Sequence, residues 1–155
     1  MKNNLDALLN QLEHYISNNE TINSQVSQST VGWQIEHSLL TINGVVSAVH
    51  KSNPKDYHWK FSLIKIMVLA TKKIPRGKAK APKVVVPKAD ITCADLEHHL
   101  AKARDTVKSL ELVSKDNYFE HPYFGKLKLK ETIRFLEIHT THHLNIIEDI
   151  VNTNQ

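Results

Sequence analysis

The sequence has few of the residues that break helices or cross-link a chain. Its 155 residues include only four glycines, five prolines and one cysteine. Because turns depend on glycine and proline, this scarcity favours long helices over many short strands. A single cysteine excludes an internal disulfide framework and gives no sign of an oxidising compartment. The composition therefore predicts a helical protein without disulfide bonds.

Long apolar runs are also missing. The first twenty residues contain no uninterrupted apolar core of the kind that a signal peptide needs, and the longest apolar run elsewhere is far short of a membrane span. We therefore expect a soluble, cytoplasmic protein that does not act at a membrane. With 155 residues, 41% of them hydrophobic, the chain has the length of one domain, spanning residues 1–155. A domain of this size can bury roughly two-thirds of the surface that its unfolded chain exposes.

Positive charge is concentrated in one segment, residues 72–88. This segment contains no acidic residue, and its basic residues exceed the net charge of +4 for the whole chain: Lys72, Lys73, Arg76, Lys78, Lys80, Lys83 and Lys88. Together with its prolines, this composition predicts an extended, solvated arm. A nucleic-acid interface is an alternative, but the arm lacks interleaved aromatic residues and the rest of the chain is not basic. Attraction of an anionic substrate is a further alternative.

Apolar residues recur at helical spacing in four segments. They predict helices over residues 4–18, 33–50, about 93–110 and 129–152, with an extra helix within residues 58–73. Ser29 or Thr30 is expected to cap the second helix, and Thr92 with Asp95 resembles a capping box at the start of the third.

These helices predict an all-α fold, a four-helix bundle with a long crossover that contains the extra helix. The shorter links, between helices one and two and between helices three and four, favour antiparallel neighbours. The link of about forty residues lets helices two and three run parallel. In that arrangement the start of the second helix lies near the end of the fourth.

Three histidines stand within the segment "HTTHHLNIIEDI", residues 139–150. Rotation by 100° per residue places His139 and His143 near the centre of the apolar stripe of the fourth helix, and His142 at its edge. Two imidazoles one turn apart, separated by roughly 6 Å of rise, can direct nitrogens at one ion. His37, which has small neighbours on the second helix, is the best candidate for a third ligand. The pattern therefore predicts a metal site at His37, His139 and His143.

The alternative is that these histidines are neutral core residues held by hydrogen bonds. Three convergent imidazoles are costly to desolvate in a small apolar bundle, whereas one divalent cation satisfies all of them. No carboxylate lies on the inward stripe of the fourth helix, and Glu36 adjoins His37 but points elsewhere, so no general base is assigned. We interpret the remaining candidates as structural or surface residues: His98, His99, His121 and Cys93, the last as a small buried hydrophobe.

Four segments occur together in order: "VGWQIEH", "IPRGKAKAP", "HPYFGKL" and "HTTHHLNIIEDI". Together they resemble the DinB/YfiT-like superfamily, specifically a branch catalogued as a domain of unknown function, over nearly the whole chain. The resemblance implies a four-helix bundle in up, down, down, up order, often dimeric. It also implies a metal held by His37, His139 and His143. Better-known relatives use zinc or nickel in thiol-dependent transfer or isomerisation, with small thiols such as bacillithiol or mycothiol.

Three neutral histidines leave a divalent ion, Zn²⁺ or Ni²⁺, with an open coordination position, as in catalytic rather than structural sites. The expected function is a metal-dependent thiol transferase that acts on a small-molecule thiol and an electrophilic acceptor, in a homodimer. A non-catalytic metal-stabilised bundle and a small-ligand binding module are the alternatives, and a nucleic-acid binder is less favoured. Because ligand histidines must be neutral, metal is expected to be lost mainly below about pH 6.

Overall fold

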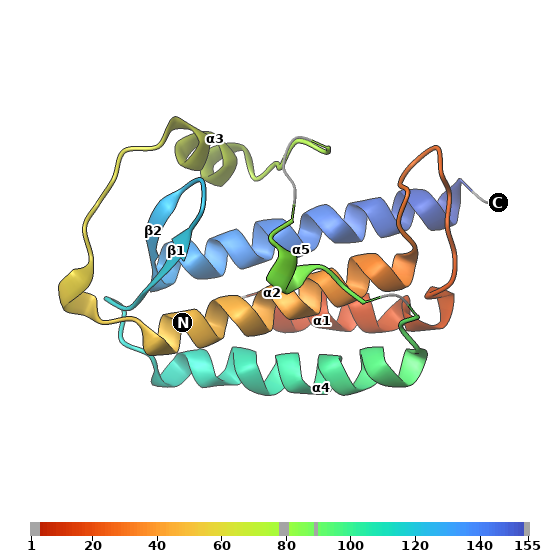
Figure 1. Cartoon of the computed structure of the whole chain (residues 1–155), viewed down its shortest axis with the longest axis horizontal. Coiled ribbons are helices and arrows are strands. Elements are labelled where there is room, and N and C mark those ends of the chain that lie inside the picture. Colours follow the sequence, from red (N-terminus) through yellow and green to blue (C-terminus); the bar gives the residue numbers. More distant parts are fainter. Residues whose placement is uncertain (1–3, 78–80, 89, 154–155) are drawn as a thin grey trace.

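Four helices lie side by side along the long axis of the molecule (Figure 1). A computed structural model describes residues 4–77, 81–88 and 90–153, and the four helices in it are α1 (Leu5–His14), α2 (Val31–Lys51), α4 (Cys93–Ser109) and α5 (Leu129–Asn152). α1 and α5 run in one direction, and α2 and α4 run in the opposite direction. The fold is therefore a mostly helical bundle. The first helix is shorter than expected, because a short 3-10 helix, η1 (Ile16–Asn18), follows α1.

The packing partners differ from the expected neighbours. α2 packs mainly against α4 and α5, and α1 packs against the same two helices. The helices joined by the shorter links, α1 to α2 and α4 to α5, are therefore antiparallel but are not the main packing partners in the described part of the chain. The links are long enough to cross the bundle, so burial of apolar faces, not link length, decides which helices meet.

Buried leucine, isoleucine and valine side chains from all four helices form the core. α2 is buried on most of its sides. Its residue Glu36 is charged but is only 5% exposed. The largest fully buried side chains are Leu5, Leu9, Leu12, Ile35, Leu39, Ile42, Leu96, Leu127, Leu136, Leu144, Ile147 and Ile150.

Side-chain caps define where two of the helices begin. The hydroxyl of Thr30 accepts a hydrogen bond from the backbone amide of Trp33, 3.1 Å away, so Thr30 and not Ser29 caps α2. Thr92 and Asp95 form the capping box that the sequence predicted at the start of α4. After α4 the chain makes a short 3-10 helix, η4 (Leu110–Leu112). Thr30 thus fixes the start of α2 about two helical turns before His37.

The segment before α5 forms a β-hairpin, so the all-α expectation was wrong at this point. Strand β1 (Tyr118–His121) pairs antiparallel with β2 (Gly125–Lys128), and His121 is opposite Gly125. Gly125 has a φ of +73°, a conformation that glycine adopts without strain. Phe124 and Leu127 are buried against the bundle, so apolar burial holds a hairpin where the sequence suggested only a turn.

The crossover between α2 and α4 contains three short elements: η2 (Pro54–Asp56), α3 (Leu63–Thr71) and η3 (Lys83–Val85). α3 confirms the expected extra helix and lies over the hairpin and α5 (Figure 1). The arm of residues 72–88 is not solvated throughout, because η3 packs on α2 and Pro87 is buried. Val85 and Pro87 dock on the bundle, whereas Val84 is 86% exposed and the described charged residues of the arm are exposed. The expectation for Lys78 and Lys80 lies outside the described residues.

None of the helices in the described ranges combines the length and the apolar character needed to cross a lipid bilayer.

Candidate metal centre

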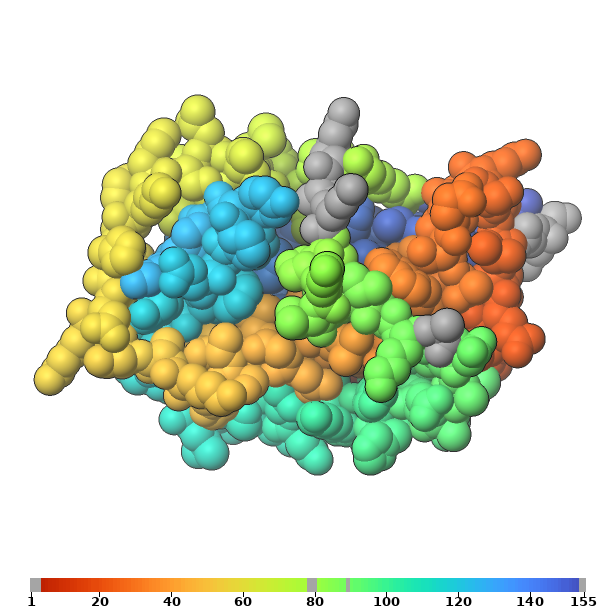
Figure 2. All heavy atoms as spheres, in the orientation of Figure 1, coloured from red at the N-terminus to blue at the C-terminus, as the bar shows by residue number. Residues whose placement is uncertain are grey.

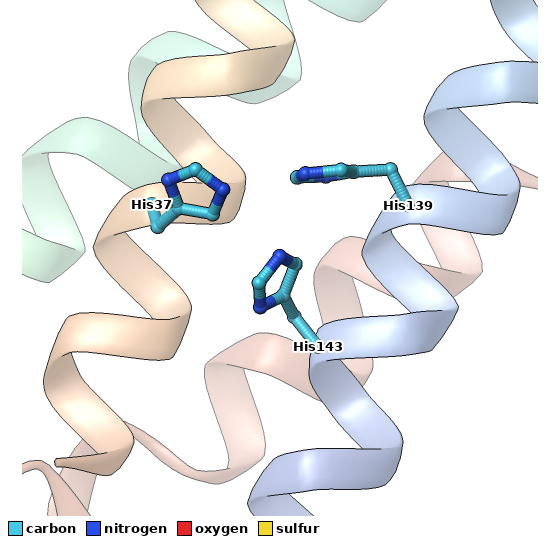
Figure 3. A group of neighbouring side chains, drawn as sticks. All are labelled: His37, His139 and His143. Atoms are coloured by element: carbon cyan, nitrogen blue, oxygen red, sulfur yellow. The ribbon is translucent and has the colours of Figure 1, made fainter. Parts of the chain in front are cut away.

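The antiparallel packing of α2 and α5 brings His37 opposite His139 and His143 (Figure 3). The centroid of the His37 ring lies 5.1 Å from that of the His139 ring and 4.7 Å from that of the His143 ring. The rings of His139 and His143, one helical turn apart on α5, are 4.6 Å apart. One ring nitrogen from each histidine lies within 4.8 Å of the other two. The three residues that the sequence singled out therefore form one cluster.

The spacing of the cluster can be compared with that of a zinc site. Four-coordinate zinc binds imidazole nitrogen at about 2.0–2.1 Å, which places the ligand nitrogens about 3.4 Å from one another. In the cluster the largest separation between these nitrogens is within 4.8 Å. The three imidazoles are therefore near enough to one another to be candidate ligands of one divalent ion.

Hydrogen bonds fix the orientation of two of the three rings. Nδ1 of His37 lies 2.7 Å from the backbone carbonyl oxygen of Val85, and Nδ1 of His143 lies 2.6 Å from Oε1 of Gln34. A carbonyl oxygen only accepts hydrogen bonds, so both Nδ1 atoms carry their proton and both Nε2 atoms keep a free lone pair. Metal-binding histidines are oriented in the same way by partners outside the coordination sphere.

The third ring, His139, has a polar atom that the protein does not satisfy. Its Nδ1 is buried and has no hydrogen-bond partner among the described residues. A buried nitrogen without a partner costs free energy, and a ring that coordinates a cation regains part of that cost. This orphaned ring, in contact with two rings whose Nε2 lone pairs are free, fits the chemistry of an all-histidine metal site.

Burial keeps the cluster uncharged. Desolvation lowers the pKa of His139 and of His143 well below the usual value of 6.5, and the neighbouring histidines lower both further. Desolvation also lowers the pKa of His37, although its hydrogen bond to Val85 opposes the shift. All three rings are therefore neutral at neutral pH, which is the form that binds metal.

Comparison with known proteins identifies the family of the chain. The sequence pattern of the DinB superfamily matches residues 4–147, a range that contains all three histidines of the cluster. The chain belongs to the DinB superfamily. No curated protein and no solved structure matched the chain.

Aromatic rings line two sides of the cluster in this DinB superfamily protein. Trp33 stacks on His37 with a centroid separation of 5.0 Å and an interplanar angle of 12°. On α5, the ring of Phe135 lies 5.6 Å from that of His139. His142 contacts His143 edge-on at 5.1 Å, but it is not one of the three convergent residues. Burial, with the charges of Arg76 and His37, lowers the pKa of His142.

The hairpin brings His121 to the same end of the site. His121 stacks on Phe124 at 4.0 Å and contacts Phe135 edge-on at 4.8 Å. Its Nδ1 accepts hydrogen bonds from the backbone amides of Tyr123 and Phe124, at 3.1 and 3.3 Å. Burial lowers the pKa of His121 to about 4. These contacts are those of a residue that stabilises the turn, as the sequence indicated.

The other candidate residues lie away from the cluster. The carboxylate of Glu36 is 2.8 Å from Nδ1 of His99, so it faces α4 and not the metal site. His98, next to His99, is exposed. Cys93 was interpreted as a small buried hydrophobe, but it is exposed, and its thiol lies 3.5 Å from the carbonyl oxygen of Ile16.

Two functional partners of the site were missed from the sequence. Gln34 lies three residues before His37 on the same side of α2, so helical rotation could have identified it. The carbonyl of Val85 left no signal, because a backbone oxygen is common to every residue and its contact depends on how the crossover docks. The site is therefore built from α2, α5 and the crossover together.

Proposed function

We propose that this protein binds one divalent transition-metal ion, Zn²⁺ or Ni²⁺, through His37, His139 and His143. One observation carries the proposal: three neutral imidazoles converge, and two of them have Nδ1 held by hydrogen bonds so that Nε2 is free. Imidazole nitrogen suits zinc, nickel and copper, whereas magnesium and calcium prefer oxygen ligands. The convergent group contains no carboxylate, which favours the first class of metal.

We further propose that the ion serves thiol transfer to an electrophilic acceptor. His37, His139 and His143 would hold the ion, and because neutral ligands leave its positive charge in place, it would favour the thiolate form of a bound thiol. The chain contributes apolar walls from Trp33 and Phe135, which limit the access of water to the cluster.

Metal content tests the first proposal without a substrate. Elemental analysis of untagged protein should find about one metal ion per wild-type chain, and much less in His37→Ala and in His143→Ala. Two matched controls remove a histidine outside the convergent group: His142→Ala beside the site and His98→Ala on the surface. Both controls should keep the metal. Equal metal content in all five proteins would exclude this cluster as the binding site.

Turnover tests the second proposal. Wild-type protein should accelerate the loss of free thiol in the presence of model electrophiles, and His139→Ala should show only the uncatalysed rate. If metal binds to the wild type but thiol is lost equally fast with both proteins, thiol transfer is wrong and metal binding stands. That result would favour the alternatives, a non-catalytic metal-stabilised bundle or a small-ligand binding module.

A nucleic-acid interface along residues 72–88 has weaker support. Arg76 in this segment is paired with Asp149 of α5 at 2.7 Å, and Val85 contacts the metal cluster. Part of the segment therefore packs against the bundle. Salt-sensitive retention on DNA would favour the nucleic-acid alternative, whereas a salt-sensitive KM without DNA retention would indicate attraction of an anionic substrate.

A further inference from the structure

α3 buries a lysine and exposes several large apolar residues, although Val68 is buried in the core. Its buried side carries Lys65, which is 4% exposed, whereas Leu63 is 70% exposed. Ile64, Ile66 and Met67 lie on the same outer side and are each about half exposed. A helix on the surface of a water-soluble bundle normally turns its apolar side inward. The outer side of α3 therefore needs an explanation other than packing within one chain.

The exposed apolar surface continues beyond the helix. In the segment that precedes α3, Trp59 is 64% exposed and Phe61 is 57% exposed, and their rings lie 6.2 Å apart. We call these two residues, with the four on the helix, the α3 face: Trp59, Phe61, Leu63, Ile64, Ile66 and Met67. Figure 2 shows the segment that carries this face on the outer edge of the molecule, above the hairpin and the bundle.

The α3 face is held rigidly against α5. The ammonium group of Lys65 lies 3.3 Å from the carboxylate of Glu131, and Val68 is buried in the core. The guanidinium of Arg134 donates two hydrogen bonds to the carbonyl oxygen of Leu69, at 3.0 and 2.8 Å. Lys65, the cationic residue of α3, lies on the inner side in these contacts, so the outer side of the helix carries no charge. The face is therefore a preformed apolar surface.

We propose that the α3 face is the contact surface between two copies of this chain. The exposed fractions of its six residues correspond to roughly 700 Å² of accessible surface, close to the 800 Å² or so that each partner buries in a stable interface. A two-fold interface brings each patch against its own copy, and the outer side of α3 does so without repulsion between like charges. The exposed Lys60, between Trp59 and Phe61 in the sequence, is a charged neighbour of the patch. Aromatic residues and methionine, both present here, are enriched in the centre of such interfaces.

Oligomeric state tests this proposal. We choose Leu63→Glu and Met67→Glu, because both side chains are at least half exposed and their replacement removes no core packing. The matched control is Leu112→Glu, which makes the same change at a leucine that is 87% exposed and lies on η4, outside the α3 face. Light scattering after size exclusion and sedimentation equilibrium measure the mass. Circular dichroism confirms that each variant is folded.

The expected result is a wild-type mass of twice 17.7 kDa at micromolar concentration. Leu112→Glu should remain dimeric, and each variant of the α3 face should have a dimer dissociation constant at least roughly 100-fold higher, because the two-fold axis places an unpaired carboxylate in the interface twice. A monomeric wild type, or a dimer that persists in Leu63→Glu and Met67→Glu, would overturn the proposal. A monomeric wild type that sediments with anionic phospholipid vesicles would also overturn it and assign the α3 face to a lipid surface.

Discussion

Oε1 of Gln34 lies 2.6 Å from Nδ1 of His143, so a residue of α2 orients a candidate metal ligand on α5. The amide of Gln34 is itself positioned by a hydrogen bond from Nε2 to the hydroxyl of Ser27, at 3.2 Å. The same helix thus provides one candidate ligand, His37, and the partner that orients another.

Replacement of Gln34 should weaken metal binding without removing a ligand. In Gln34→Ala, Nδ1 of His143 loses its acceptor and the ring loses its fixed orientation. Loss of such a partner typically lowers metal affinity by about 10–100-fold. Competition with a chromogenic chelator measures the change. Gln11→Ala, an exposed glutamine on α1, is the control and should match the wild type. Equal affinity in all three proteins would show that Gln34 does not support the site.

His121 should make the protein less stable in acid. Its pKa is about 4 in the folded protein and near 6.5 when unfolded, so the unfolded chain binds more protons between these values. The stability due to neutral His121 is therefore present above pH 6.5 and is lost as the pH falls toward 4. His121→Asn keeps an acceptor for the turn amides but does not titrate.

Between pH 7 and pH 4, the free energy of unfolding of the wild type should fall by up to about 3 kcal/mol more than that of His121→Asn. Urea denaturation at several pH values measures both proteins. His121 also contributes, as the smallest cause, to the lowered pKa of His139, so the difference between the two proteins reports mainly on His121. Parallel pH profiles would contradict a depressed pKa at this residue.

Metal should be retained to a lower pH than the sequence suggested. Loss mainly below about pH 6 follows from the reference pKa of histidine, whereas burial lowers the pKa values of His139 and His143 well below 6.5. Protons therefore compete less well for the ligand nitrogens. Metal content after desalting should be unchanged at pH 6 and should fall only at more acidic pH. Loss of half of the bound metal at pH 6.5 or above would contradict this expectation.

The start of α2 should depend on Thr30 and not on Ser29. Thr30→Ala removes the acceptor for the amide of Trp33, and loss of such a cap typically destabilises a protein by about 1 kcal/mol. Ser29→Ala should change the free energy of unfolding by much less. Thermal or urea unfolding of the two variants beside the wild type distinguishes them. Equal destabilisation by both substitutions would show that Ser29 also caps the helix.

The sequence was most informative where one helical face carries the signal. His139 and His143 stand one turn apart on an apolar stripe, and the repeat of 3.6 residues is enough to place both inward. His37 required the relative directions of two helices, which the long crossover suggested. The structure brings these three residues together.

The sequence was least informative where tertiary packing decides local structure. The segment around His121 reads as a turn, but Phe124 and Leu127 find buried positions and the chain forms a hairpin. The basic segment reads as solvated, but Val85 and Pro87 dock on the bundle. In α3, periodicity identified the helix but not its orientation, because its apolar side faces outward and Lys65 faces inward.

The hydrogen bond from His37 to Val85 spans 48 positions of the chain, and α3 lies between its two ends. The candidate metal site is therefore complete only after the crossover has docked, a long-range event that generally follows local helix formation. The metal affinity measured during refolding would therefore indicate whether the crossover has docked. A refolding intermediate with formed helices and an undocked crossover would bind metal weakly, and tight binding would mark the final step of assembly.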